Sequence, residues 1–373
     1  MIKRQLFSDL ENKLFKGKTI VLIGPRQVGK TTLIENLLLD NDHLFLNGDD
    51  PTVRRILSSI DTENLKSLLG DHRVVFIDEA QRIDNIGLTA KLIHDQFKDK
   101  QLILSGSSAF ELNNATTEPL TGRKWEYRLY PISWAEFENH IGYLKAEQQL
   151  DLRLVYGLYP DVINNIGQEG EVLQQLTESY LYKDVLAYSG IRKPEVLEKL
   201  VRALAYQISS EVNYSELSNM LQIDKNTVAS YVRLLEQAFV VFRLPSFSRN
   251  LRNEIKTNQK IYFYDNGIRN MVIGNLNPLS VRDDKGALWE NFLVSERLKR
   301  HAYTKSLTKM YFWRTKAQQE IDLVEEAASK LNAFEFKWNK KARAKFPTTF
   351  LNAYDAETEL ISRENFRDFL KVT

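Results

Sequence analysis

The segment from Gly24 to Thr31 combines two glycines, a lysine and a threonine at a fixed spacing. Gly24, Gly29, Lys30 and Thr31 fill every fixed position of the pattern G-x-x-x-x-G-K-[ST]. Glycines allow the backbone to approach a ligand closely, so that N–H groups of the loop and of the following helix can face phosphate oxygens. Lys30 is then expected to contact the β- and γ-phosphates of ATP, and the Thr31 hydroxyl to bind Mg²⁺. The residues expected to contact the nucleotide are Gly24, Pro25, Arg26, Gln27, Val28, Gly29, Lys30, Thr31 and Thr32.

An acidic pair, Asp78 and Glu79, ends the apolar run that begins at Val74. At the end of a strand beside the loop, Asp78 would hold the metal through its water shell, and Glu79 would orient and polarise the attacking water. A third apolar run ends in Ser105-Gly-Ser-Ser. Two interpretations stay open there: Ser105 or Ser107 bonds the attacking water or the γ-phosphate, or the serines are an ordinary polar strand end.

Arg123, in Leu120-Thr-Gly-Arg, is a candidate for neutralising charge at the γ-phosphate. It would act either on the nucleotide of its own subunit or on that of a neighbouring copy. The alternative is a surface arginine without a role in catalysis. Arg26, inside the loop, is expected to be exposed.

A second set of chemically suggestive residues lies near the C-terminal end of the sequence. Asp322 falls on one expected strand, and Glu335 and Lys337 fall on one face of the next, because side chains alternate with a period of two. This D-(x)n-E-x-K layout resembles that of restriction-type nucleases. The resemblance implies that Asp322 and Glu335 hold Mg²⁺, that Lys337 helps to generate hydroxide, and that Glu290 is a further ligand.

The charge around these residues is locally positive. Residues 280–346 contain 15 Lys and Arg against 9 Asp and Glu, a difference of +6 that would attract a phosphodiester backbone. Two interpretations stay open: an active nuclease, or a nuclease-like fold that has lost its activity and binds partners. The basic residues that flank the expected site are Arg314, Lys316, Lys340, Lys341, Arg343 and Lys345.

The elements expected to position the first site are short apolar strands that alternate with helical segments. The strands are expected at Thr19–Ile23, His43–Leu46, Val74–Ile77 and Gln101–Leu104. Such alternation is typical of an α/β fold with a parallel sheet covered by helices on both faces. Three domains are predicted: a P-loop ATPase domain at residues 1–140, a helical and winged-helix region at 141–250, and a mixed α/β nuclease-like domain at 251–373.

Residues 211–245 have the pattern of a winged helix-turn-helix. A short helix begins at Tyr214, and a second helix at Lys225–Phe239 has Asp224 placed to cap its first N–H groups. In a DNA reader, polar residues of the second helix would contact phosphates and base edges. The segment holds few basic residues, and the alternative is that it only packs between its neighbours.

The motifs together resemble the prokaryotic AAA-type ATPases in which a C-terminal domain of unknown function follows the ATPase. The similar segments include Phe76-Ile-Asp-Glu-Ala-Gln, Leu120-Thr-Gly-Arg, Tyr264-Asp-Asn-Gly-Ile-Arg-Asn and Gly286-Ala-Leu-Trp-Glu-Asn-Phe. The resemblance covers nearly the whole chain, and it implies ATP binding and a nuclease-like C-terminal fold.

The composition of the sequence excludes some kinds of site and partner. The sequence has no cysteine, which excludes disulfides and thiolate sites. Its formal net charge of +2 gives no overall field toward nucleic acid or membrane. With no signal-like N-terminus and no long apolar run, we expect a cytoplasmic protein without membrane contact.

The sequence thus predicts a Mg²⁺-dependent ATPase whose hydrolysis drives a nuclease-like, DNA-binding or partner-binding C-terminal part. The alternative is a DNA-associated switch that binds ATP with negligible turnover. DNA, through the winged helix or the basic C-terminal segment, and further copies of the chain are the candidate partners.

Overall fold

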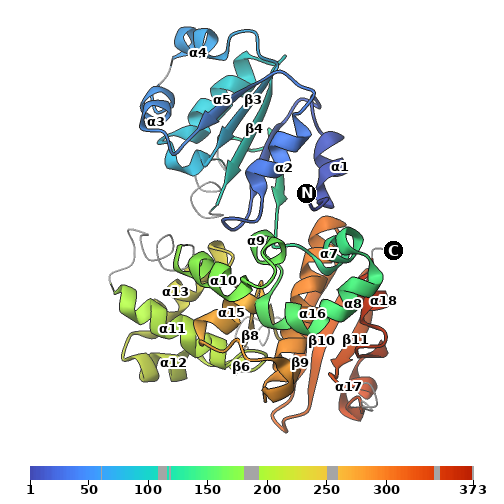
Figure 1. Ribbon diagram of the computed structural model, residues 1–373. Helices are drawn as coiled ribbons and strands as arrows, with labels where there is room; N and C mark the ends of the chain where they lie inside the picture. Colours follow the sequence, from blue (N-terminus) through green and yellow to red (C-terminus); the bar gives the residue numbers. More distant parts are fainter. Residues whose placement is uncertain are drawn as a thin grey trace. The chain divides into compact units, whose positions relative to one another are not determined.

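A computed structural model describes residues 1–59, 61–107, 116, 119–179, 193–249, 259–339 and 345–371. The chain forms two compact units, shown in Figure 1. Unit 1 is Met1–Pro131 with Gln237–Phe239, and unit 2 is Ile132–Glu236 with Val240–Thr373. The first unit therefore ends at Pro131, earlier than the predicted boundary at residue 140. The two later predicted domains, 141–250 and 251–373, lie together in unit 2.

Unit 1 contains a five-stranded parallel sheet with the strand order β2-β3-β4-β1-β5. The four strands predicted from apolar runs are present, and their side chains in β1, β3 and β4 are buried throughout. The fifth strand was missed because its sequence, Lys-Trp-Glu-Tyr-Arg, has the mixed polarity of a sheet edge. The strands are β1 Thr19–Ile23, β2 His43–Asn47, β3 Val74–Asp78, β4 Gln101–Gly106 and β5 Lys124–Arg128.

Helices follow the strands of unit 1 and pack along the sheet (Figure 1). Local capping explains where two of them start. The Asp50 carboxylate accepts a hydrogen bond from the Thr52 N–H at 2.7 Å, and Asp61 accepts one from Asn64 at 2.8 Å. The helices are α1 Leu6–Glu11, α2 Lys30–Leu37, α3 Pro51–Leu57, α4 Thr62–Leu69, η1 Ala80–Arg82 and α5 Ile86–Gln96.

Unit 2 begins with helices, as predicted for residues 145–210. The first is fixed by a capping box, in which the Ser133 hydroxyl and the Glu136 side chain each bond the other residue's backbone N–H. The predicted helical residues Tyr180 and Leu181 lie outside the described part of the chain. The helices are α7 Trp134–Ile141, α8 Tyr143–Tyr156, α9 Pro160–Asn164, α10 Glu169–Thr177 and α11 Pro194–Tyr206.

Two further helices and three strands follow α11. The Asp224 side chain accepts a hydrogen bond from the Asn226 N–H at 2.7 Å, which confirms it as the cap of α13. The strands form an antiparallel sheet in the order β6-β8-β7. These elements are β6 Glu211–Val212, α12 Tyr214–Leu221, α13 Lys225–Gln237, β7 Val241–Pro245 and β8 Gln259–Phe263.

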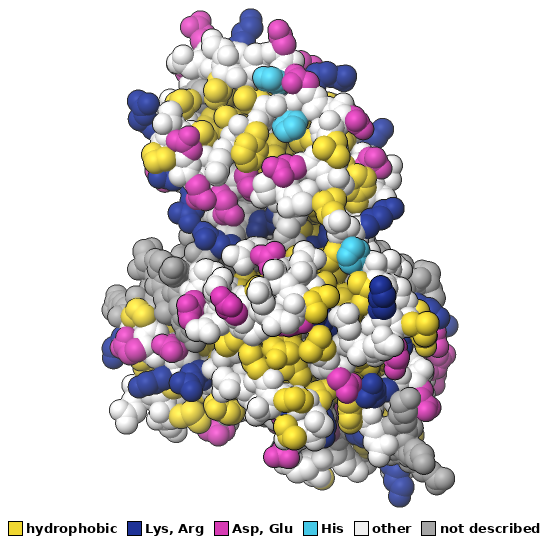
Figure 2. Space-filling model, in the orientation of Figure 1, with side chains coloured by type: hydrophobic (Ala, Val, Ile, Leu, Met, Phe, Trp, Pro, Cys, Tyr) yellow, Lys and Arg dark blue, Asp and Glu magenta, His cyan; other side chains and the backbone are white. Residues whose placement is uncertain are grey.

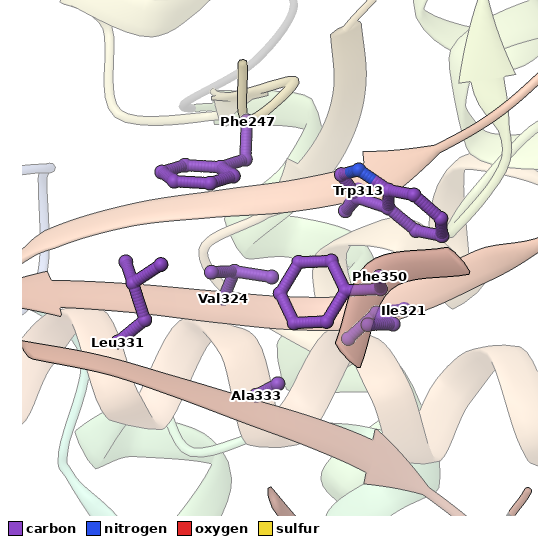
Figure 3. Packing of buried hydrophobic residues seen from close by; sticks show 7 residues of the cluster. All are labelled: Phe247, Trp313, Ile321, Val324, Leu331, Ala333 and Phe350. Atoms are coloured by element: carbon purple, nitrogen blue, oxygen red, sulfur yellow. The ribbon is translucent and has the colours of Figure 1, made fainter. Parts of the chain in front are cut away.

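The last part of unit 2 is a mixed four-stranded sheet with the order β12-β11-β10-β9. The remaining helices and strands of unit 2 are α15 Asn266–Val272, η3 Leu279–Val281, α16 Lys285–Tyr303, β9 Lys309–Arg314, β10 Glu320–Ala327, β11 Lys330–Phe336, α17 Thr348–Ala353, β12 Ala356–Ile361 and α18 Phe366–Leu370. Apolar side chains from β9, β10, β11 and α17 close over one face of the sheet, as Figure 3 shows for the cluster around Phe350. Burying each large side chain of this kind contributes about 1.5–3 kcal/mol.

Acidic, basic and apolar side chains are interspersed over the visible surface of both units in Figure 2, in line with the small net charge. Among the described residues, no helix has the length and hydropathy needed to cross a membrane.

Candidate nucleotide-binding site and C-terminal carboxylate cluster

The loop between β1 and α2 has the backbone geometry that its two glycines allow. Gly29 has a φ of 87°, in the left-handed region that side chains disfavour. At Gly24, an added Cβ would lie 2.0 Å from the carbonyl oxygen of Leu129. At Gly24 a side chain would force the backbone to move, and at Gly29 it would be strained by the left-handed φ, so both glycines suit the fold of the loop itself.

Lys30, the first residue of α2, lies inside this loop. Its ammonium group donates hydrogen bonds to the carbonyl oxygens of Gly24 and Pro25, both at 2.9 Å, and its side chain is buried. Neutral carbonyls are weaker partners for an ammonium group than phosphate oxygens, because bonds between two charged groups are about twice as strong. The arrangement therefore keeps a lysine at the place where a phosphate would bind.

Asp78 ends β3 beside the loop. The Thr31 hydroxyl donates to one carboxylate oxygen at 2.6 Å, and the Ser105 hydroxyl and the Glu79 N–H donate to the other. Parallel strands bring their carboxyl ends to one edge of a sheet, which is why residues far apart in sequence meet here. A carboxylate and a hydroxyl are hard oxygen donors of the kind that Mg²⁺ prefers. Thr31 and Asp78 thus fit a Mg²⁺ ion that accompanies a nucleotide.

Glu79 has a φ of 46°, an unusual value for a residue with a side chain. Its carboxylate accepts hydrogen bonds from Gln81 Nε2 at 2.5 Å and from the Ser107 hydroxyl at 3.1 Å. Gln81 was not singled out from the sequence, although its position two residues after the carboxylate was visible. Ser105, near the end of β4, bonds Asp78, and Ser107, just after the strand, bonds Glu79; neither sequence interpretation included these bonds.

The other predicted contact residues of the loop differ in exposure. Val28 is fully buried, and its carbonyl oxygen accepts a bond from Arg4 at 2.6 Å. Gln27 and Thr32 are exposed, and Arg26, expected to be exposed, is half-buried. Val28 can therefore contribute only backbone groups to a ligand.

Arg123 lies at the opposite end of the sheet. Its carbonyl oxygen pairs with the Thr19 N–H at the start of β1, whereas the loop follows the end of that strand. Its guanidinium bonds Asp95 at 2.9 Å and lowers the pKa of that carboxyl. The prediction that Arg123 contacts the nucleotide of its own subunit is therefore wrong, because a strand length of about 16 Å separates them. Action on a neighbouring copy stays a prediction.

The predicted C-terminal residues do come together in unit 2. The pairing of Leu323 with Phe334 between antiparallel β10 and β11 puts Asp322 opposite Glu335. Asp322 accepts a hydrogen bond from the Phe336 N–H at 2.8 Å, and Lys337 pairs with Glu335 at 3.0 Å. Glu290, from α16, belongs to the same cluster, because it interacts electrostatically with Asp322 and with Lys337.

A residue missed in the sequence analysis, Lys260 of β8, lies among these carboxylates. Its fully buried ammonium group bonds Glu290 at 2.9 Å and also pairs with Glu320. The Tyr262 hydroxyl donates to the same Glu290 oxygen at 2.7 Å. No sequence signal pointed to Lys260, because it stands alone on a strand far from the other members.

Burial dominates the electrostatics of this cluster. It raises the pKa of the Glu290 carboxyl to about 7, despite the opposing effect of Lys260. Burial and the nearby charge of Asp322 raise the pKa of Glu335 to about 7. Burial would lower the pKa of Lys260, but the charges of the surrounding carboxylates outweigh it and raise that pKa.

A metal ion held by Asp322 and Glu335, as the nuclease resemblance implies, stays a prediction. Within the part of the chain that the structure describes, no group of three or more His, Cys, Asp or Glu residues is arranged to hold a metal ion. The buried ammonium group of Lys260 supplies the positive charge that a divalent ion would otherwise bring. The basic residues Lys340, Lys341 and Arg343 lie outside the described residues.

Three segments of the chain match models of known domain families. Residues 16–138 match the model of an AAA domain, residues 147–279 match a domain of unknown function (DUF8612), and residues 285–368 match another (DUF4143). An uncharacterized protein of Mycobacterium tuberculosis is 26% identical over 340 residues, which are 90% of this chain and 74% of that one. An uncharacterized protein of Haemophilus influenzae is 25% identical over 337 residues, 83% of this chain and 80% of the other.

Among solved structures, a Walker-type ATPase of Pyrococcus abyssi has a similar fold. Its TM-score is 0.51 at 16% sequence identity, over 73% of this chain and 96% of that one. At this identity the likeness concerns the fold alone. The loop geometry, the domain match and this fold agree that the chain carries an AAA-type P-loop domain, followed by segments that match domains of unknown function.

Proposed function

We propose that this protein binds ATP with Mg²⁺ and hydrolyses it at the loop between β1 and α2. The observation that supports this most strongly is the hydrogen bond between Thr31 and Asp78, formed at 2.6 Å beside a buried Lys30. Lys30 would leave its two carbonyl partners and bind the β- and γ-phosphates. Thr31 and Asp78 would hold the metal, which when bound neutralises charge on the phosphates.

Glu79 is the proposed general base. It lies next to Asp78 at the carboxyl edge of the sheet, where the γ-phosphate of a loop-bound nucleotide would end. Gln81 and Ser107 bond one of its carboxylate oxygens, which fixes the side chain and leaves the other oxygen to orient a water molecule. Such a base contributes about 10²–10⁴-fold to a hydrolytic rate.

Steady-state ATP hydrolysis by Glu79→Gln tests this proposal. We expect turnover to fall by about 10²–10⁴-fold while ATP affinity stays the same, because only the water-activating role needs the carboxylate. Glu35→Gln, an exposed carboxylate on α2, is the matched control and should leave turnover unchanged. An unchanged turnover number in Glu79→Gln would rule out Glu79 as the base.

For the C-terminal part of unit 2 we propose partner binding rather than nucleic-acid cleavage. The buried Lys260 among Glu290, Glu320 and Asp322 supports this, since it neutralises carboxylates that a nuclease would leave to its metal. A cleavage assay with Mg²⁺ or Mn²⁺, with and without ATP, on double- and single-stranded DNA and on RNA should give no product. Cleavage that Asp322→Ala abolishes would overturn this proposal.

A second candidate is a DNA-associated switch with negligible turnover. Two observations favour it: Lys225, Asn226 and Arg233 are exposed on α13, and Glu79 is engaged by Gln81. Gln81→Ala separates the two candidates. If Gln81 positions the base, turnover falls; if it holds Glu79 in a resting state, turnover rises from near zero, and duplex DNA binding should depend on Arg233.

A further inference from the structure

A cavity of about 630 Å³ lies in unit 1 at the amino ends of β1 and β4, at the opposite end of the sheet from the ATP loop. Pockets that bind small ligands commonly have about 300–1,000 Å³. A strand length of about 16 Å separates it from the loop, so a ligand here would not be the nucleotide bound by Lys30.

The cavity is lined by an excess of positive charge. Lys18, Arg73, Lys98 and Lys100 face it together with Asp95 and Asp99, four cations against two carboxylates. Asp95 is already paired with Arg123 at 2.9 Å. Among the described residues, no carboxylate pairs with Lys18, Arg73 or Lys98. The Lys18 ammonium group lies 4.4 Å from the centroid of the Trp125 ring, a contact that leaves its charge without a carboxylate partner.

An aromatic side chain is held at the same cavity under backbone strain. Phe15 is 41% exposed and has a φ of 57°, a conformation that costs a residue with a side chain free energy. Its N–H donates to the Gln101 side chain at 2.7 Å, and the buried Gln101 amide donates to the Lys18 carbonyl oxygen at 3.0 Å. Gln101 of β4 thus fixes the turn that presents Phe15, and the Arg73 guanidinium lies 5.0 Å from the ring centroid.

We propose that this cavity is a second binding site that takes a phosphorylated ligand with a planar base, either a free nucleotide or the end of a single-stranded nucleic acid. Lys18, Arg73 and Lys98 bind the phosphates. Asp99 accepts hydrogen bonds from sugar hydroxyls or base amino groups, and Phe15 stacks on the base. Stability alone would favour burying or replacing a strained, exposed phenylalanine, whereas stacking on a ligand gives it a role.

Binding is tested with the full chain carrying Lys30→Ala, which removes the loop lysine. The probes are a fluorescent ADP analogue and a fluorescein-labelled ten-residue oligothymidylate, each titrated while anisotropy is measured. We expect saturable binding of at least one probe, weakened about tenfold or more by Lys98→Glu, because the reversal replaces an attraction to phosphate by a repulsion. Lys91→Glu, an exposed lysine of α5 that does not line the cavity, is the matched control and should change nothing.

Phe15→Asn separates a binding role from a structural one. Asparagine tolerates a positive φ, so the melting temperature should stay the same or rise, while affinity should fall about tenfold with the loss of stacking. Binding of the ADP analogue indicates a free nucleotide, and binding of the oligothymidylate alone indicates a strand end. The proposal is wrong if neither probe binds saturably, or if binding survives both Lys98→Glu and Phe15→Asn.

Discussion

The loop site of unit 1 and the carboxylate cluster of unit 2 use the same residue types in different ways. In the loop site, Lys30 donates hydrogen bonds to neutral carbonyl oxygens, and Asp78 accepts hydrogen bonds from neutral hydroxyls. In the cluster, Lys260 is fully buried and bonds Glu290 directly. The lysine of the loop site thus bonds carbonyl oxygens that a phosphate can replace as partners, whereas the lysine of the cluster bonds carboxylates inside the fold.

Among the variants that test this comparison, Lys260→Met is expected to lose the most stability. Removing one partner of a buried ion pair leaves an uncompensated buried charge, which costs about 3–5 kcal/mol. Urea unfolding followed by tryptophan fluorescence reports mainly on unit 2, because Trp134, Trp289, Trp313 and Trp338 belong to it and only Trp125 to unit 1. Adding Glu290→Gln should recover part of the loss; an unaltered unfolding midpoint in Lys260→Met would show that the pair is not structural.

A second test uses Glu325, three residues after Asp322 on β10 but with the opposite pKa shift. Burial would raise the pKa of its carboxyl, but hydrogen bonds from Arg297 and His301 outweigh burial and lower it to about 2. Because the folded pKa lies below the unfolded value of about 4.5, this carboxylate stabilises the fold above pH 4.5, and the contribution disappears as the pH falls toward 2.

Its size is on the order of 3 kcal/mol, since each pKa unit corresponds to about 1.4 kcal/mol. Unfolding free energies measured between pH 7 and pH 2.5 should therefore fall less steeply in Glu325→Gln than in the wild type. Parallel curves for the two proteins would contradict the assignment.

The smallest effect is expected for Lys337→Met. This lysine pairs with Glu335 at 3.0 Å, but its side chain is 40% exposed. Exposed pairs contribute about 0–1 kcal/mol, so the midpoint of urea unfolding should barely move. A loss as large as that of Lys260→Met would mean that Lys337, and not Lys260, is the main counter-charge of the cluster.

The sequence predicted best what rests on local patterns. The apolar runs of β1, β3 and β4 and the glycines of the loop depend on neighbouring residues, and their position at the edge of a parallel sheet follows from the fold class. The edge strand β5 was missed because its residues are of mixed polarity and two of its five side chains are exposed. Without β5, the position of Arg123 could not be predicted, since the pairing of β5 with β1 puts it at the amino edge of the sheet.

The carboxylate cluster of unit 2 could be predicted from the sequence only in part. A period of two placed Glu335 and Lys337 on one face, and Asp322 was identified from the D-(x)n-E-x-K layout on the preceding strand; the structure brings the three together. Lys260 comes from β8, in a different sheet, and no local pattern relates its position to theirs. The electrostatics of the cluster depend on contacts between residues far apart in the sequence. Local spacing in a single sequence does not reveal such contacts.

The central claim, that the loop binds ATP through Lys30, is tested most directly by calorimetric titration of a non-hydrolysable ATP analogue with Mg²⁺ into the wild type and Lys30→Ala. Two charge-assisted hydrogen bonds to phosphate are worth roughly 1.5–3 kcal/mol each, so the substitution should weaken binding at least about a hundredfold. We expect saturable binding in the wild type, with one nucleotide in the loop, and no detectable heat from that site in Lys30→Ala. Equal affinities in the two proteins would contradict it.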